Sequence, residues 1–319
     1  MTKYYPANLI RKNLKEVLIK SKVKEDFAEM VSQSLVKASL RGVHSHGVAL
    51  INRYLNEIEN GILEPNLQPE FVINKTQISI EAKLNNYKGF GQVGTILLID
   101  KLLRIIDKST SLISLTITNC NHIGDLKQYA EKFNSNNFCF IGVASAGANV
   151  GLKNGKKVGT NPFCLTIPIK IGDDEFIGCD LATSVFPEGK VRVAKMNKAE
   201  LPEDIIYDAN GIPSVNPNDL YDGGWLRPFG GYKGFAMASS IDLFLGFLGG
   251  STNALGWTCG NNAQFFSIKS SKPNENLTVD RIKSYFNEDI PALRELEAER
   301  LALINGIKVD EQTVKLLNL

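Results

Sequence analysis

The sequence Leu112-Ile-Ser-Leu-Thr-Ile-Thr-Asn-Cys-Asn-His-Ile-Gly124 joins a run of apolar and β-branched residues to one of only three histidines in the chain. Residues 112–118 have the composition typical of a strand, and His122 lies in the polar turn that follows. Similar runs predict strands at residues 78–82, 138–143, 163–169 and 176–181, with helices between them at 94–106 and 126–133. This alternation predicts an α/β core.

Helical periodicity marks both ends of the chain. Apolar residues recur along one stripe from Glu25 to Leu40 and again from Ala49 to Asn60, and a glycine follows each segment. Further helices are predicted at 235–248 and 291–304. The intervening residues 195–231, rich in Pro, Asn, Asp and Gly, are predicted as a loop. We therefore expect helices from both chain ends to flank the α/β core.

The composition narrows the possible classes of protein. The 36 basic and 34 acidic residues leave a net charge of +2 without a dense basic stretch, which argues against nucleic acid or an anionic membrane as a partner. The N-terminus lacks the apolar run of a secretory signal, and the apolar segment 235–250 is too short to span a bilayer. The five cysteines form no Cys-x-x-Cys pair, so we expect buried thiols rather than disulfides or a zinc site, and a cytoplasmic location.

The histidines occupy two short motifs, Arg41-Gly-Val-His-Ser-His-Gly47 and Asn119-Cys-Asn-His-Ile-Gly124. Imidazole titrates near neutrality, so it suits reversible proton transfer, although a loop histidine can also serve as a simple hydrogen-bond donor. Ser45 is expected to cap a helix that begins near Val48. His46 would then lie at the positive end of that helix, which lowers the pKa of its imidazole.

Two glycine-rich segments are candidates for dinucleotide binding. Gly89-Phe-Gly-Gln-Val-Gly94 matches a Rossmann fingerprint, but four residues separate it from the preceding strand and no acidic residue ends the next one. The segment from Arg227 to Gly234 is the better candidate, because a helix start and Lys233 could together hold phosphate. Residues 159–162 and 180–184 would add small and polar groups at strand ends, although each is also compatible with an ordinary turn.

Taken in order, these motifs resemble the malate/L-lactate dehydrogenase family of the second type, whose members include ureidoglycolate and sulfolactate dehydrogenases, diketogulonate reductase and piperideine-carboxylate reductase. The resemblance runs over nearly the whole chain. Its matching elements are Ser45-His-Gly47 with Arg53-Tyr54, Asn121-His-Ile-Gly124 with Tyr129, Gly159-Thr-Asn-Pro162, Asp180 to Ser184, Gly189-Lys190, Leu201-Pro202, Asp208 to Pro213 and Gly230-Gly-Tyr-Lys-Gly234.

The resemblance implies a non-Rossmann α/β fold, a homodimer, and hydride transfer between NADH or NADPH and a small 2-oxo or 2-hydroxy acid or cyclic imine. It implies a helical domain for substrate binding and dimerisation (residues 1–70 plus 285–319) and an NAD(P)-binding domain (71–284). Its site residues fall into three groups. The catalytic candidates are His46, His122 and Ser45, the substrate-binding candidates are Tyr54, Arg53 and Leu50, and the cofactor-binding candidates are Thr160, Asn161, Asp180, Leu181, Ala182, Thr183, Ser184 and Lys233.

Three departures from the family pattern keep an alternative open. Leu50 stands where relatives carry an arginine that could clamp the substrate carboxylate. Pro291-Ala292-Leu293 replaces a Pro-Gly-Glu near the cofactor, and Pro187-Glu188 replaces small or basic residues. The chain could therefore have an altered substrate, or could be a catalytically silent member that acts as a binding protein. His44 has no counterpart in the pattern, and we expect it at the surface.

Overall fold

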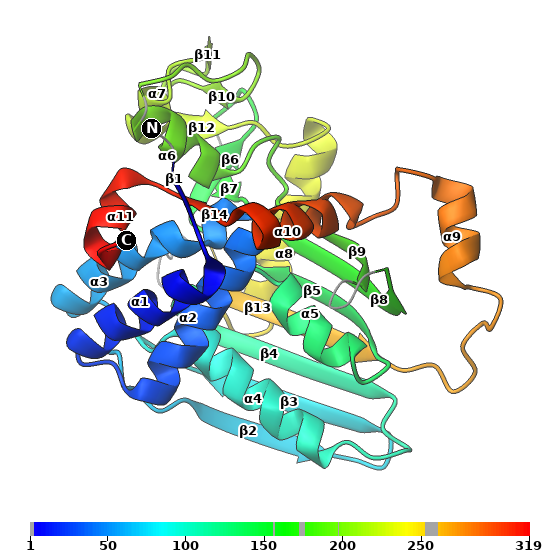
Figure 1. The fold of residues 1–319 in the computed structure, drawn as a ribbon. Coiled ribbons are helices and arrows are strands. Elements are labelled where there is room, and N and C mark those ends of the chain that lie inside the picture. Colours follow the sequence, from blue (N-terminus) through cyan, green and yellow to red (C-terminus); the bar gives the residue numbers. More distant parts are fainter. Residues whose placement is uncertain (1–2, 156, 172–175, 197, 253–260) are drawn as a thin grey trace.

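The computed structural model describes residues 3–155, 157–171, 176–196, 198–252 and 261–319. Its centre is a seven-stranded sheet (Figure 1) in the order β2-β3-β4-β13-β5-β8-β9. The strands are β2 (Glu70–Lys75), β3 (Ser79–Asn85), β4 (Leu112–Cys120), β5 (Cys139–Ala144), β8 (Phe163–Lys170), β9 (Phe176–Leu181) and β13 (Asn261–Ile268). All five strands predicted from the sequence are present.

The sheet is not that of a Rossmann fold. Only β3 and β4 run parallel to each other, and every other neighbouring pair is antiparallel. Two helices, α4 (Gly91–Ile105) and α5 (Lys127–Asn134), cover one face, where Leu115, Tyr129 and Phe265 are among the fully buried core residues. The predicted non-Rossmann α/β class is therefore confirmed, since a Rossmann sheet is mostly parallel.

A second, five-stranded sheet corrects the prediction of a loop at 195–231. Its order is β11-β10-β12-β6-β7, made from β6 (Ala148–Gly151), β7 (Lys157–Gly159), β10 (Ile206–Tyr207), β11 (Pro213–Ser214) and β12 (Trp225–Leu226), with α6 (Glu188–Met196) and α7 (Asn218–Tyr221) beside it. Val150, Val191, Ile206 and Leu226 are fully buried in its core. Strands of two residues are too short to leave a periodic signal.

Helices from both ends of the chain pack together. They are α1 (Ala7–Lys20), α2 (Glu25–Leu40), α3 (Ile51–Glu59), α10 (Leu293–Asn305) and α11 (Glu311–Leu317), and β1 (Lys3–Tyr5) pairs with β14 (Ile307–Val309). The prediction for α2 is confirmed at both ends. The segment predicted as a helix from Ala49 begins instead within the 3₁₀ turn η2 (Val48–Leu50), which follows another such turn, η1 (His44–His46), and it becomes α-helical only at Ile51.

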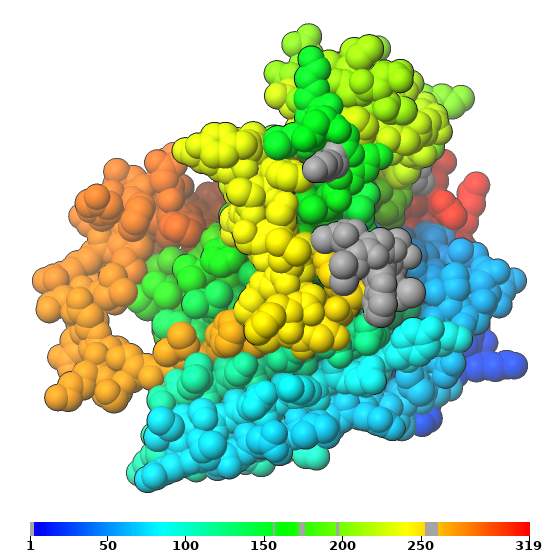
Figure 2. All heavy atoms as spheres, turned by 180° about the vertical axis from the view of Figure 1, so that it is seen from behind, coloured from blue at the N-terminus to red at the C-terminus, as the bar shows by residue number. Residues whose placement is uncertain are grey.

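Two further helices complete the fold. The apolar helix α8 (Tyr232–Phe247) lies on the face of the large sheet opposite α4 and α5, and Figure 2 shows it at the surface in yellow. The short helix α9 (Val279–Phe286) stands away from the rest of the molecule on an arm of the chain (Figure 1). Over the ranges that the structure describes, no helix has both the length and the apolarity needed to cross a bilayer.

Candidate active site

His46 and His122, which are 76 positions apart in the sequence, lie side by side in the structure. Their ring centroids are 5.4 Å apart and their planes are inclined by only 16°. Both rings lie deep in the protein, yet each keeps part of its surface accessible. Two imidazoles arranged in this way can contact the same small molecule, as the two sequence motifs led us to expect.

His46 is held by the turn η1 rather than by a helix cap. Ser45 Oγ lies 3.1 Å from His46 Nδ1. The expectation that Ser45 caps the following helix is wrong, because the amide of Val48 donates to Ser39 Oγ at 3.0 Å and η2 has no side-chain cap. The serine hydroxyl is therefore left to the imidazole, and it can donate to Nδ1 or accept from it.

His122 is fixed by a directed chain of hydrogen bonds. Gln92 on α4 donates from Nε2 to Tyr54 Oη at 2.7 Å, and Tyr54 Oη lies 2.8 Å from His122 Nδ1. Burial raises the pKa of the Tyr54 hydroxyl, so this group keeps its proton. Because the tyrosine oxygen accepts from Gln92, its O–H donates to Nδ1. The proton of neutral His122 then resides on Nε2.

The electrostatic surroundings of the two imidazoles differ. Burial is the largest cause that lowers the pKa of both, and the pKa of His122 lies well below its ordinary value. Around His46, the carboxylates of Asp125 and Glu188 act against burial and favour the charged ring. Around His122, His46 and two arginines add to burial and disfavour the charged ring. The pKa of His46 is therefore lowered, as predicted, and burial is its largest cause.

The glycine fingerprint Gly89 to Gly94 serves packing. A Cβ on Gly91 would lie 2.3 Å from the carbonyl oxygen of Asn121 and 2.6 Å from that of His122. A Cβ on Gly89 or Gly94 would lie 2.3 or 2.6 Å from the side chain of Asn86. These glycines let the start of α4 approach the His122 turn and Asn86, which accounts for the motif without a pyrophosphate.

The three predicted substrate-binding residues have different environments. Tyr54 contacts His122 directly, as described. Arg53 is 41% exposed and donates from Nε to Glu57 Oε1 at 2.6 Å. Leu50 is only 4% exposed and belongs to the core of the helical region with Val48 and Ile51. Leu50 therefore packs in the hydrophobic core of the helical region.

The cofactor-binding candidates around residue 160 converge on one place. The amide and hydroxyl of Thr183 both donate to the carbonyl oxygen of Thr160 at 2.8 Å, and the amide of Phe229 donates to the carbonyl oxygen of Thr183 at 3.0 Å. The fully buried side chain of Asn161 bonds to the amide of Ala146 and the carbonyl of Ala238. The side chains of Asn161 and Thr183 therefore hold this region together, while Thr160 remains partly exposed.

Asp180, at the start of the candidate segment 180–184, binds the backbone of α5 and not the region around Thr160. Asp180 Oδ2 accepts the amides of Leu126 and Lys127 at 2.9 and 3.0 Å, so it caps the start of α5 from a neighbouring strand. Burial, and then the charge of Asp125, raises the pKa of Asp180 to about 7. Leu181 is exposed and Ala182 half-buried, while the Ser184 hydroxyl donates to the carbonyl of Phe186.

Lys233 lies at the beginning of α8 behind a turn of two glycines. Gly230 and Gly231 have φ of +56° and +63°, values that only glycine adopts at no steric cost. A Cβ on Gly231 would meet nothing within 4 Å. The space beside Gly231 is therefore open, and the exposed Lys233 lies at the positive end of α8, where its own amide donates to the carbonyl oxygen of Gly230.

The helix α6 joins this region to the histidines. It begins five residues after Thr183, and a Cβ on Gly189 in its first turn would lie 2.5 Å from Ser45 Cβ. The chain from Thr183 to Gly189 is six residues long and can span at most about 20 Å, a distance that a dinucleotide could bridge. Gln92 acts on His122 through Tyr54, and Asp125, Glu188 and Arg192 act on the histidines through their charges, although the sequence analysis assigned none of the four a role. One feature of the sequence could have pointed to Gln92, because it is a polar residue on the buried side of an apolar helix.

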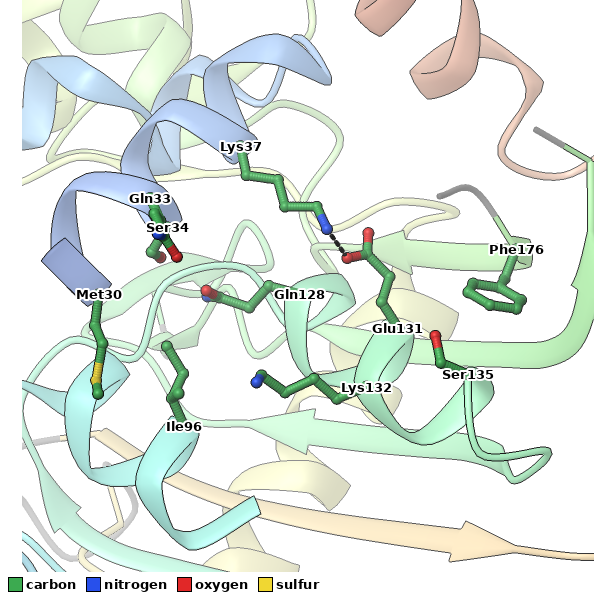
Figure 3. A pocket seen from close by; sticks show the side chains of 10 residues that line it. All are labelled: Met30, Gln33, Ser34, Lys37, Ile96, Gln128, Glu131, Lys132, Ser135 and Phe176. Atoms are coloured by element: carbon green, nitrogen blue, oxygen red, sulfur yellow. Dashed lines mark ion pairs between the residues drawn. The ribbon is translucent and has the colours of Figure 1, made fainter. Parts of the chain in front are cut away.

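A cavity of about 300 Å³ lies apart from the histidines, between α2, α4 and α5. Figure 3 shows Lys37 and Glu131 pointing toward one another at its edge, where they form an ion pair. Glu131 also pairs with the buried Arg41, which in turn bonds to Asp125 at 2.9 and 3.3 Å. This network thus reaches Asp125, the carboxylate that favours charged His46. In the described part of the chain, no cluster of three or more His, Cys, Asp or Glu could hold a metal ion.

Comparison with known proteins identifies the family. The sequence model of the malate/L-lactate dehydrogenase family matches residues 6–318. Malate dehydrogenase of Pyrococcus abyssi is 31% identical over 249 residues, which cover 74% of this chain and 66% of that protein. Malate/(S)-sulfolactate dehydrogenase of Methanothermus fervidus is 28% identical over 318 residues, covering 92% and 90%.

Solved structures agree on the fold. The Δ1-piperideine-2-carboxylate reductase of Pseudomonas syringae pv. tomato gives a TM-score of 0.83 at 22% identity, covering 99% of each chain. Malate dehydrogenase of Pyrococcus horikoshii gives 0.82 at 24% identity, covering 99% of this chain and 94% of that one. The chain therefore belongs to the malate/L-lactate dehydrogenase family, a family of oxidoreductases, and the resemblance drawn from the sequence motifs is confirmed.

Proposed function

We propose that the protein transfers a hydride between NADH or NADPH and a small 2-oxo or 2-hydroxy acid, or a related cyclic imine carboxylate. The observation that carries this proposal is the stacked pair His46 and His122, deep in the protein but still accessible. Reduction of a carbonyl leaves negative charge on its oxygen, which needs a proton donor as the charge forms. Oxidation needs the same group as a base.

His46 is the proton-transfer residue in this proposal. Asp125 and Glu188 favour its charged form, and the Ser45 hydroxyl can pair with Nδ1 in either protonation state because a hydroxyl both donates and accepts. His122 has a different task. Protonation at its Nδ1 would oppose the hydrogen bond that Tyr54 donates, so it stays neutral and offers its Nε2 proton to the substrate oxygen.

The residues around Thr160 and Lys233 fit a nicotinamide cofactor. The exposed ammonium of Lys233 and the positive end of α8 suit the phosphates, and the Gly230-Gly231 turn leaves open space beside them. The backbone near Thr160 and Thr183 lies beside this turn. When bound, the cofactor supplies or accepts the hydride. The protein contributes the orientation of the substrate and the proton.

We further propose that the protein is a cytoplasmic homodimer, divided into a helical domain (1–70 plus 285–319) and an NAD(P)-binding domain (71–284). Separate hydrophobic cores in the large sheet and the terminal helices support this division. The homodimer is supported by exposed apolar side chains on the back of the large sheet and on α8, namely Leu112, Leu165, Ile268, Leu243, Phe244 and Phe247, which are 37–87% exposed.

The continuity of this surface favours a second copy of the chain as its occupant. Phe244 packs near Phe266, with ring centroids 6.5 Å apart, and Phe266 is aligned through Ile141 with Leu165, so α8 and the sheet form one surface. The buried cores of homodimer interfaces are richer in apolar side chains than the rest of a protein surface, as this surface is.

Thermal unfolding with added cofactor tests the oxidoreductase proposal. A ligand that binds only the folded state raises the free energy of unfolding, by about 2.7 kcal/mol at one hundred times its Kd. We expect NADH or NADPH to raise the melting temperature by several degrees, and the larger shift to identify the preferred cofactor. If saturating amounts of both leave melting unchanged, the proposal fails.

The catalytically silent alternative makes a different prediction. The burial of Leu50 where relatives have an arginine is the observation in its favour. Such a protein would bind the cofactor but consume none of it with any 2-oxo acid or cyclic imine. Steady consumption of NADH or NADPH with pyruvate, oxaloacetate, sulfopyruvate or piperideine-2-carboxylate would rule it out.

A further inference from the structure

The geometry points to Arg192 on α6 as the residue that binds the substrate carboxylate in this protein, after release from Glu188. This inference rests on the proposed function and adds the residue that selects an anionic substrate. It requires that Arg192 faces the histidines, that it is free to leave its present partner, and that Arg53, the other guanidinium whose charge acts on His122, is not equally free. The structure addresses each requirement.

The packing of α6 directs Arg192 toward the site. Gly189, in the first turn of the helix, is pressed against Ser45, so this side of α6 faces the turn η1 that carries His46. Arg192 follows Gly189 by three positions, which places both on one face of the helix. Val191 is fully buried in the core of the small sheet and marks the opposite direction. The charge of Arg192 also contributes to the low pKa of His122.

Arg192 is held by a contact that can be exchanged. Its Nη2 lies 2.6 Å from Glu188 Oε2, and its side chain is 46% exposed. The other oxygen, Glu188 Oε1, accepts the hydroxyl of Tyr221 at 2.7 Å. When Arg192 turns to a substrate carboxylate, it replaces one carboxylate contact by another of the same kind. Glu188 keeps the donor from Tyr221 and is not left alone.

Arg53 is the competing cation, since its charge also reaches both histidines. Its Nε is bonded to Glu57 Oε1 at 2.6 Å, and the residue Glu57 is only 9% exposed. The second carboxylate oxygen, Glu57 Oε2, has no hydrogen-bond partner among the described residues. Moving Arg53 away would leave a buried carboxylate without its cation, which is strongly unfavourable. Arg53 therefore stays in place, and Arg192 is the releasable guanidinium.

The test compares Arg192→Gln and Arg192→Lys with the wild type at saturating cofactor. We expect Arg192→Gln to raise KM for pyruvate or oxaloacetate by tens- to a hundred-fold, with kcat within a few-fold and KM for the cofactor unchanged. Arg192→Lys should show a smaller rise, because it keeps the charge but loses the paired N–H donors. Lys195→Gln is the matched control, as Lys195 lies on the same helix with its ammonium 4.4 Å from the centre of the Tyr221 ring.

A binding measurement separates this inference from the proposed function. Calorimetric titration of oxalate into the cofactor-loaded protein needs no turnover. We expect Arg192→Gln to weaken oxalate binding by tens-fold, and Glu188→Gln to tighten it several-fold. Unchanged oxalate affinity and KM in Arg192→Gln would overturn the inference, as would a raised KM for the cofactor. If the wild type binds oxalate through Arg192 but reduces no substrate, the proposed function fails and the binding site remains.

Discussion

The position of the proton on His122 depends on two residues that do not touch the substrate in our proposal. Gln92 donates to Tyr54, and Tyr54 donates to His122 Nδ1. A buried amide on one helix thereby sets which nitrogen of an imidazole on a distant turn carries hydrogen. The sequence motif around His122 identifies the imidazole, but it contains neither of these partners.

Replacing Tyr54 by phenylalanine tests this arrangement. The variant keeps the ring and its packing against Phe90 but removes the hydroxyl that fixes the tautomer of His122. We expect kcat to fall by about ten- to a hundred-fold, within the range typical of acid–base contributions. Tyr207→Phe in the small sheet is the control. Steady-state kinetics that give the same kcat for Tyr54→Phe and wild type would contradict the assignment.

The carboxyl of Asp180 gives a prediction for the pH dependence of stability. Its pKa is about 7 in the folded protein against an ordinary value of 3.8, so between these values the folded state binds the extra proton. The contribution of this group to the free energy of unfolding therefore declines as the pH rises from about 4 to 7.

Asp180→Asn should remove that penalty, because an amide oxygen can still accept the amides of Leu126 and Lys127 without a buried charge. We expect the variant to gain stability relative to wild type as the pH rises, with the full difference above pH 7 and little near pH 4. Urea denaturation at pH 5 and pH 8 measures this. A difference that is equal at both pH values, or larger at pH 5, would show that Asp180 does not titrate as described.

Among the elements of the fold, α4 begins with a glycine motif that matches a dinucleotide-binding fingerprint but serves close packing. Its glycines allow contact with the His122 turn and with Asn86. Gly91→Ala should therefore push the His122 backbone away, with a cost of about 1–3 kcal/mol in stability and a fall in kcat. Gly147→Ala is the control, since its Cβ would meet nothing within 4 Å. If Gly91→Ala matches that control in melting temperature and kcat, the close approach of Gly91 to the His122 turn contributes neither to stability nor to catalysis.

The elements themselves differ in how well the sequence predicted them. The helix α2 and the strands β4 and β8 have long apolar patterns and were predicted almost to the residue. The strand β13 lies between β4 and β5 at the centre of the sheet, yet it was not predicted. Its sequence Asn261-Asn-Ala-Gln-Phe-Phe-Ser-Ile268 is half polar, and the buried side chain of Gln264 is accommodated by bonds to Thr116 and Ser114. Tertiary hydrogen bonds of this kind leave no local pattern.

For the whole molecule, the surface that joins α8 to the back of the large sheet predicts the oligomeric state. We expect a homodimer in sedimentation velocity, and dissociation to monomers when Leu243 and Phe247 are both replaced by glutamate, because charged residues are costly to bury without partners. Val72→Glu, at an exposed position of the edge strand β2, should leave the dimer intact. A monomeric wild type, or a variant that stays dimeric, would refute this interface.

The sequence by itself determined the α/β class, the family and the two histidine motifs, because these depend on periodicity and on residue types at short spacing. Only the tertiary structure decided that His46 and His122 stack, that Gln92 and Tyr54 direct the proton of one of them, and that the first turn of α6 packs against the turn that carries His46. These features join residues on α3, α4, α6 and two turns, far apart in the chain. Their contacts depend on how helices and sheets pack, which no short stretch of sequence records.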